Sequence, residues 1–169
     1  LRQGGWDGKI TVIGDEVELP YHRPPLSKDF LSGQKTIDDI LIRPGDAYEA
    51  ADIDMKLGVR VGSINREDKT ILTDDGETLP YDKLVLTTGA RVRHLPVPGE
   101  DLDGVYYLRD TVDVLAIKDK CETAKTAVII GGGYIGLVTA ASLRKQGLKV
   151  TVLEAMSRIL QRVTAEEMS

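Results

Sequence analysis

The chain has 169 residues, of which 41% are hydrophobic and 29% charged, and its formal net charge is −5. This balance is typical of a soluble globular protein that is long enough to bury a core, as one domain or as parts of two. A negative chain argues against a nucleic-acid partner, which needs a basic stripe, and the apolar runs are too short to span a membrane. No signal peptide is visible, and we expect a cytoplasmic location.

The first half of the chain predicts short elements. Residues 9–13 alternate and carry β-branched side chains, which indicates a strand. Residues 24–33 (PPLSKDFLSG) predict a short helix started by proline, and residues 45–53 (GDAYEAADI) predict another. Residues 56–86 predict a β-meander that leads into a buried strand at residues 84–87. The opening LRQGG resembles a helix tail, so we expect a segment of a longer protein.

The second half predicts a clearer pattern. A loop rich in proline and glycine, residues 89–104, is the best candidate for a domain boundary. Residues 105–108 (VYYL) resemble a strand, and a helix is expected from Asp110 to about Lys120. Residues 126–154 then read as strand, helix and strand, with the spacing of a parallel crossover of about thirty residues.

A glycine pattern, GGGYIG, opens the helix of that crossover. Gly131 permits a tight turn, Gly133 permits the close approach of a pyrophosphate, and Gly136 permits close packing of helix on strand. Glu154 ends the next strand about twenty residues later, where a carboxylate can accept hydrogen bonds from ribose hydroxyls. The pattern predicts a dinucleotide site and favours NAD over NADP, although two arginines nearby weaken that preference: Arg158 and Arg162. The alternative is a tight turn with no ligand.

The same logic applies to the strand at residues 9–13. Asp15 and Glu16 follow it, which is where the acid of a second dinucleotide site belongs. The planar guanidinium of Arg23 can bind a phosphate through two hydrogen bonds, and the ammonium group of Lys28 can bind it as a single charge. The adjacent prolines stiffen the loop that carries both residues. The alternative is a solvated loop.

Cysteine and histidine exclude other chemistry. Cys121 is the only cysteine, so no dithiol relay or cysteine metal pair can form, and we expect it half-buried near a helix end. His22 and His94 lie in loops beside prolines and are expected to be loop residues, not metal ligands.

The stretch LPYHRPPLSKDFL, residues 19–31, closely resembles the signature of FAD-dependent reductases that serve ferredoxins. This family includes putidaredoxin reductase, rubredoxin reductase and the reductase components of aromatic-ring dioxygenases, and apoptosis-inducing factor shares its layout. The resemblance covers essentially the whole chain, through YDKLVLTTGA and VIIGGGYIGLVTAASLRKQGLKVTVLE. It implies an α/β fold with tandem Rossmann-like, glutathione-reductase-like domains and a small β-meander inserted in the FAD part. Residues 1–108 would be a partial FAD-binding domain without its first βα unit, and residues 109–169 a partial NAD(H)-binding domain.

The resemblance also implies two sets of cofactor contacts. Those for FAD are Asp15, Glu16, Arg23, Lys28, Val61, Thr88, Gly89, Arg93 and Arg109. Those for NAD are Gly131, Gly133, Ile135, Gly136, Glu154 and Arg162. Lys28 would lie near the reactive flavin edge and is the expected catalytic residue. The family usually has a glutamate at the position of Val138 that approaches this lysine, so we hypothesise that Lys28 here pairs elsewhere or stays solvated and that nicotinamide docks differently.

The implied activity is electron transfer from NADH through FAD to a [2Fe–2S] ferredoxin of an oxygenase or P450 chain, with no metal, nucleic acid or membrane involved. Disulfide reductases of similar layout carry a cysteine pair where this chain has PYHRPPLSK, so electrons should leave directly for an outside acceptor. Two alternatives remain open: another flavin reductase, such as an NADH oxidase or a nitrite-reductase-like protein, and a redox-signalling protein like apoptosis-inducing factor.

Overall fold

The computed structural model describes residues 1–168 and divides the chain into two compact units. One unit combines residues 1–21 with 41–89, and the other combines residues 22–40 with the described residues from 90 onward. Each unit is therefore discontinuous in sequence. Among the described residues, no helix is long and apolar enough to cross a membrane.

The first unit contains a parallel strand pair. Strand β1 (Ile10–Gly14) pairs with β2 (Ile53–Leu57), and helix α1 (Gly45–Ala50) leads into β2. Arg2, in a 3₁₀ turn at Arg2–Gly4, fastens this arrangement because its guanidinium donates hydrogen bonds to the carbonyls of residues 51 and 52 at 2.8 and 2.7 Å. Parallel pairing brings the carboxyl ends of both strands to one edge.

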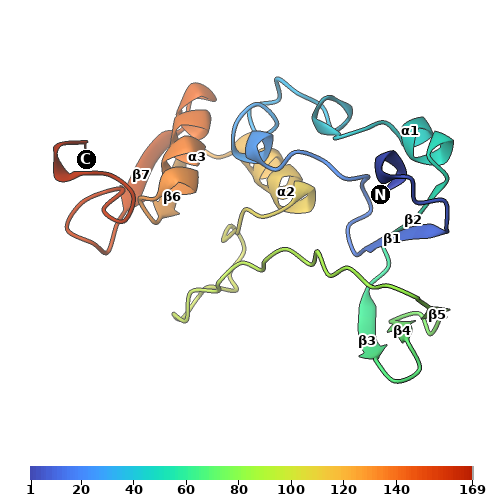
Figure 1. Ribbon diagram of the computed structural model, residues 1–169. Coiled ribbons are helices and arrows are strands. Elements are labelled where there is room, and N and C mark those ends of the chain that lie inside the picture. Colours follow the sequence, from blue (N-terminus) through green and yellow to red (C-terminus); the bar gives the residue numbers. More distant parts are fainter. Residues whose placement is uncertain (169) are drawn as a thin grey trace. The chain divides into compact units, whose positions relative to one another are not determined.

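An antiparallel sheet follows in the same unit (Figure 1, green). Strand β3 (Val61–Asn65) pairs with β4 (Thr70–Thr73), which pairs with β5 (Thr78–Pro80). The predicted β-meander is confirmed. Its buried apolar side chain is Ile71, on the middle strand.

The second unit contains the strand–helix–strand pattern (Figure 1, orange). Strands β6 (Thr126–Ile130) and β7 (Lys149–Leu153) pair in parallel, and α3 (Tyr134–Lys145) connects them, as predicted. The preceding helix, α2 (Thr111–Cys121), is also confirmed, and a capping box between Asp110 and Asp113 starts it.

Most of the buried apolar side chains lie in this second unit. They are Leu26, Phe30, Leu31, Ile40, Val114, Leu143 and Leu148. Two hydrogen bonds join α3 and the residue after it to residues 22–31, here called the proline-rich segment: Ser142 Oγ donates to the carbonyl of Ser27 at 2.8 Å, and Gln146 Nε2 donates to that of Leu31 at 3.2 Å. The proline-rich segment is therefore part of the core around α3. Two further 3₁₀ turns span Asp38–Ile40 and Glu166–Met168.

Three sequence predictions of secondary structure are wrong, and a fourth is confirmed only over a shorter range. The helix expected at residues 24–33 is only a 3₁₀ turn, Pro24–Ser27, because Lys28 leaves helical geometry at φ −120° and ψ −108°. The helix predicted at residues 45–53 is confirmed as α1, but it ends at Ala50, and Ile53 begins an unpredicted strand, β2. Residues 84–87 and 105–108 form no strand, since neither pairs with any described strand, and Val85 and Leu86 are exposed.

Candidate functional site

The glycine turn between β6 and α3 is sterically tight. Gly131 has φ +112°, a region that side chains disfavour. A Cβ added at Gly136 would lie 2.0 Å from the carbonyl oxygen of Gly131. Because that neighbour is backbone, it cannot rotate away. The geometry explains why residue types with side chains do not fit at these two positions.

Gly133 differs from Gly131 and Gly136 because neither its backbone angles nor any described neighbouring atom requires a glycine at this position. Its backbone is extended, at φ −82° and ψ −177°, which suits any residue. A Cβ added there would meet no described atom within 4 Å. This residue caps α3, and no side-chain cap satisfies the first N–H groups of the helix, which have no partner within the helix itself. The position is open to a group from outside the chain, and such helix starts suit phosphates.

Glu154, just after β7, is held by this same turn. Its Oε2 accepts a hydrogen bond from the Gly132 N–H at 2.7 Å, and its Oε1 accepts one from the Met156 N–H at 2.8 Å. These backbone bonds, with a smaller contribution from the positive charge of Arg162, lower the pKa of the Glu154 carboxyl below its usual value. The carboxylate therefore stays ionised at neutral pH with a fixed direction.

The two arginines that weaken the NAD preference differ in position. Arg158 directs its guanidinium to backbone carbonyls of the following loop, at 3.1 Å to Thr164 and 3.3 Å to Ala165. Arg162 contributes charge near Glu154. Arg158 thus stabilises the loop after β7. These hydrogen bonds direct its guanidinium to the loop carbonyls and not to Glu154.

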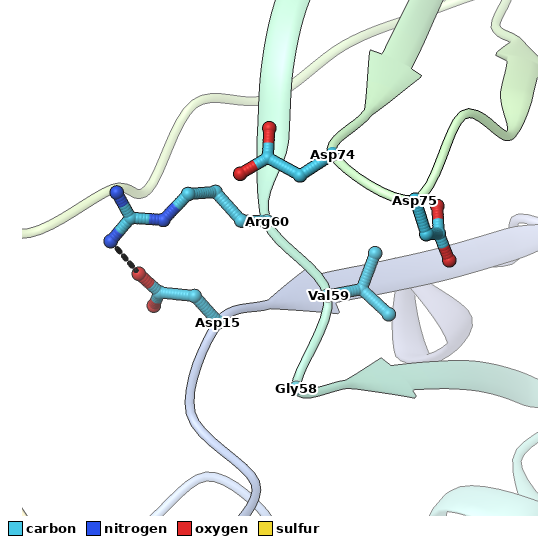
Figure 2. Close-up of a pocket in the computed structure, with 6 residues that line it drawn as sticks. All are labelled: Asp15, Gly58, Val59, Arg60, Asp74 and Asp75. Atoms are coloured by element: carbon cyan, nitrogen blue, oxygen red, sulfur yellow. Dashed lines mark hydrogen bonds and ion pairs between the residues drawn. The ribbon is translucent and has the colours of Figure 1, made fainter.

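A hollow opens in the first unit at the carboxyl ends of β1 and β2. Its volume is about 490 Å³, and its lining residues are Asp15, Gly58, Val59, Arg60, Asp74 and Asp75. Figure 2 shows the Arg60 guanidinium extending from the segment before β3 toward Asp15, which follows β1. Arg60 Nη2 lies 3.0 Å from Asp15 Oδ2. The place matches the edge of parallel strands where ligands generally bind.

Asp15 and Glu16, the two acids that follow β1, have different surroundings. The Glu16 carboxylate accepts a hydrogen bond from the Tyr21 hydroxyl, whereas Asp15 lines the hollow. The Val59 N–H donates to the carbonyl of Gly14 at 2.9 Å, which fixes the start of β3 against β1. Val61, at the first position of β3, is 37% exposed. Asp15 is thus the better placed of the two acids to meet a ligand in the hollow.

In the second unit, the structure brings together two predicted arginines. Arg23 Nη1 donates to the carbonyl oxygen of Arg109 at 2.9 Å. Lys28 is exposed at the end of the 3₁₀ turn. Val138 is half-buried on α3 and lies one helical turn before Ser142, which bonds the residue next to Lys28. Val138 and the proline-rich turn therefore belong to the same packed region.

The remaining predicted contacts lie in loops. Thr88, Gly89 and Arg93 are exposed and have no regular secondary structure. The loop after Arg93 is pinned by Tyr107, whose hydroxyl donates to Glu100 Oε2 at 2.6 Å and accepts from the Leu95 N–H at 2.9 Å. The tyrosine bond, with a smaller contribution from His94, lowers the pKa of Glu100.

The predicted flavin contacts divide between the two units. The first unit contains Asp15, Glu16, Val61, Thr88 and Gly89, and the second contains Arg23, Lys28, Arg93 and Arg109. Cys121 is half-buried as expected, and burial raises the pKa of its thiol. Within residues 1–168, no group of three or more His, Cys, Asp or Glu could hold a metal ion. Arg60 is a lining residue of the hollow that the sequence did not indicate, because it occupies an ordinary polar position in an alternating strand pattern.

The chain matches the model of a family described as pyridine nucleotide-disulphide oxidoreductase over residues 1–169. It is 41% identical to putidaredoxin reductase from Pseudomonas putida over all of its length, which is 41% of that relative. A crystal structure of a ferredoxin reductase from Rhodopseudomonas palustris superposes with a TM-score of 0.94 at 39% identity, covering 99% of this chain and 41% of that one. The covalent putidaredoxin reductase–putidaredoxin complex superposes with a TM-score of 0.90 at 40% identity, with the same coverage. The chain thus spans about two fifths of the length of these relatives.

Proposed function

Because the chain belongs to the pyridine nucleotide-disulphide oxidoreductase family, we propose that it is part of an NADH-dependent flavoprotein reductase that passes electrons through FAD to a [2Fe–2S] ferredoxin. The observation that carries this proposal is the 41% identity with putidaredoxin reductase along the whole chain. The solved reductase–putidaredoxin complex, which the chain resembles at 40% identity, supports a ferredoxin as the partner. A cytoplasmic location would suit such an electron-transfer chain.

The glycine turn and Glu154 would bind NADH. The open position at Gly133 and the uncapped start of α3 suit a pyrophosphate, and Gly131, Ile135 and Gly136 complete the turn. Glu154, ionised and fixed by backbone N–H groups, would accept hydrogen bonds from the adenosine ribose and repel a 2′-phosphate. Arg162 would lie beside that ribose.

The residues that match the family's flavin contacts would hold the flavin dinucleotide. Asp15 would accept a hydrogen bond from the ribose, with the hollow beside it for adenosine, and Arg23 and Lys28 would provide positive charge for the pyrophosphate and the ring. The remaining expected contacts are Glu16, Val61, Thr88, Gly89, Arg93 and Arg109. Bound FAD supplies a ring that accepts a hydride and releases electrons singly, which NADH cannot do. The chain's sole cysteine leaves no dithiol pair beside these residues.

The test uses the full-length protein that contains this chain. We expect a yellow protein that reduces ferricyanide with NADH, and that reduces cytochrome c only when a [2Fe–2S] ferredoxin is added. NADPH should be the poorer donor. Oxygen consumption that is independent of ferredoxin would instead favour an NADH oxidase. A colourless protein that takes up no FAD and leaves NADH unoxidised with every acceptor offered would contradict the proposal.

Lys28 gives a more local test. We expect Lys28→Met to slow flavin reduction by NADH about tenfold, because a cation beside the reacting ring stabilises the charge that develops there. Lys125→Met is the matched control, since Lys125 is an exposed lysine of the second unit that the proposal does not use. Stopped-flow absorbance of the flavin measures both rates, and equal slowing in the two variants would contradict this role.

A further inference from the structure

The hollow beside Asp15 is unusually acidic for a site that would receive a dinucleotide. Three of its lining residues are aspartates, Asp15, Asp74 and Asp75, and its one lining cation is Arg60. Asp75 is engaged locally, because it accepts hydrogen bonds from the Thr73 hydroxyl and the Glu77 N–H. A ligand that enters the hollow therefore meets two carboxylates that have no such turn contacts, and Arg60 beside them.

Arg60 and Asp15 are in direct contact. The pair is 3.0 Å apart, and the two side chains are 58% and 56% exposed. An exposed ion pair contributes little to folding stability, so stability alone gives little reason for it. Its geometry has another consequence: Oδ2 of Asp15 is occupied by the guanidinium, and among the described residues Oδ1 has no hydrogen-bond partner.

We infer that Arg60 is a positioning residue for the adenosine half of FAD, an inference that rests on the proposed function. By holding Oδ2, Arg60 fixes the direction of the Asp15 carboxylate and leaves Oδ1 to accept a hydrogen bond from a ribose hydroxyl. Its charge also offsets the neighbouring aspartates, which would otherwise repel the FAD pyrophosphate. The segment that carries Arg60 is itself anchored, because the carbonyl of Arg60 accepts a hydrogen bond from the Asp74 N–H at 2.9 Å.

The test compares FAD with FMN, which lacks adenosine. The full-length protein is stripped of flavin, and each flavin is titrated back while its fluorescence is followed. We expect Arg60→Met to weaken FAD binding about fivefold, the size that loss of an exposed but oriented ion pair permits, and to leave FMN binding unchanged. Arg66→Met is the matched control, since Arg66 is an exposed arginine of the same unit outside the hollow, and it should change neither affinity.

A second pair of variants tests whether Arg60 acts through Asp15. In an Asp15→Asn background, Arg60→Met should weaken FAD binding by much less than fivefold, because the carboxylate it orients is gone. Equal FAD affinity in the wild type and Arg60→Met, equal losses for FAD and FMN, or an undiminished effect in the Asp15→Asn background would each overturn the inference. None of these outcomes affects the proposed function, which is tested separately by FAD uptake and ferredoxin-dependent electron transfer in the wild-type protein.

Discussion

The two strand ends that carry an acid, one after β1 and one after β7, hold it by different means. Glu154 is fixed by two backbone N–H groups, whereas Asp15 is fixed by the side chain of Arg60. Backbone donors remain whatever the side chains become, so the Glu154 arrangement survives most substitutions nearby. The Asp15 arrangement depends on one residue. A carboxylate can thus be oriented by backbone N–H groups at one strand end and by a single arginine side chain at another.

The largest effect is expected at Gly136, where backbone meets backbone. We predict that Gly136→Ala lowers the free energy of unfolding by about 3 kcal/mol, because the added Cβ overlaps the Gly131 carbonyl and forces α3 away from β6. Urea titration of the full-length protein, followed by circular dichroism, measures it. Wild-type stability in this variant would mean that α3 and β6 do not approach as closely as described.

Gly133 should behave in the opposite way. We expect Gly133→Ala to leave the free energy of unfolding within about 0.5 kcal/mol of the wild type, because its Cβ meets no described atom within 4 Å. NADH binding should nevertheless weaken about tenfold, since the methyl group would stand where the pyrophosphate approaches. The KM for NADH and the urea midpoint separate the two effects, and a variant that loses stability but not NADH affinity would reverse the interpretation.

A smaller effect is expected at Val138. If the absence of a carboxylate here alters Lys28 and nicotinamide docking, Val138→Glu should change NADH affinity or the rate of flavin reduction about two- to fivefold, as a new ion pair with the exposed Lys28 permits. Val138→Gln is the matched control, because it has the same size and polarity without the charge. No change in either quantity would refute the hypothesis.

The smallest effect is expected at Glu154, and it depends on pH. Hydrogen bonds from the backbone lower the pKa of this carboxyl in the folded state below its ordinary value of 4.5. A lowered pKa means that the stabilisation is fully present above the ordinary value and is lost as the pH falls through the lower, folded value. Glu154→Gln should therefore have a slightly lower Tm than the wild type at neutral pH, and the difference should shrink below pH 4.5. A difference that grows in acid would contradict this account.

The sequence predicted β6, α3 and β7 well because their signals are local. The glycines, the helical period and the strand alternation all occur within one stretch, and each indicates the same structure. Strand β2 was missed because its partner, β1, lies far away in the sequence and because its first residue fell in a predicted helix and its last two in a predicted meander. The strand predicted at residues 84–87 has the right composition, but a strand also needs a neighbour, and composition does not specify one.

The candidate site likewise contains residues that local sequence signals predict and one residue that they do not. Glycine positions and the acid after a strand follow from what a phosphate and a ribose require, so Gly131, Gly133, Gly136, Glu154 and Asp15 could be selected from spacing. Arg60 could not, because its partner is 45 positions earlier and nothing in VRVGSI distinguishes it from a solvent-facing strand residue.

The bonds from Ser142 and Gln146 to residues 27 and 31 have a consequence for biosynthesis. Each spans 115 positions, so the proline-rich segment leaves the ribosome long before the helix that anchors it exists. Leu26, Phe30 and Leu31 are buried in the folded structure, so their side chains stay exposed to solvent until α3 has been synthesised. The nascent chain should therefore be most vulnerable to proteases and most attractive to chaperones until α3 has been synthesised.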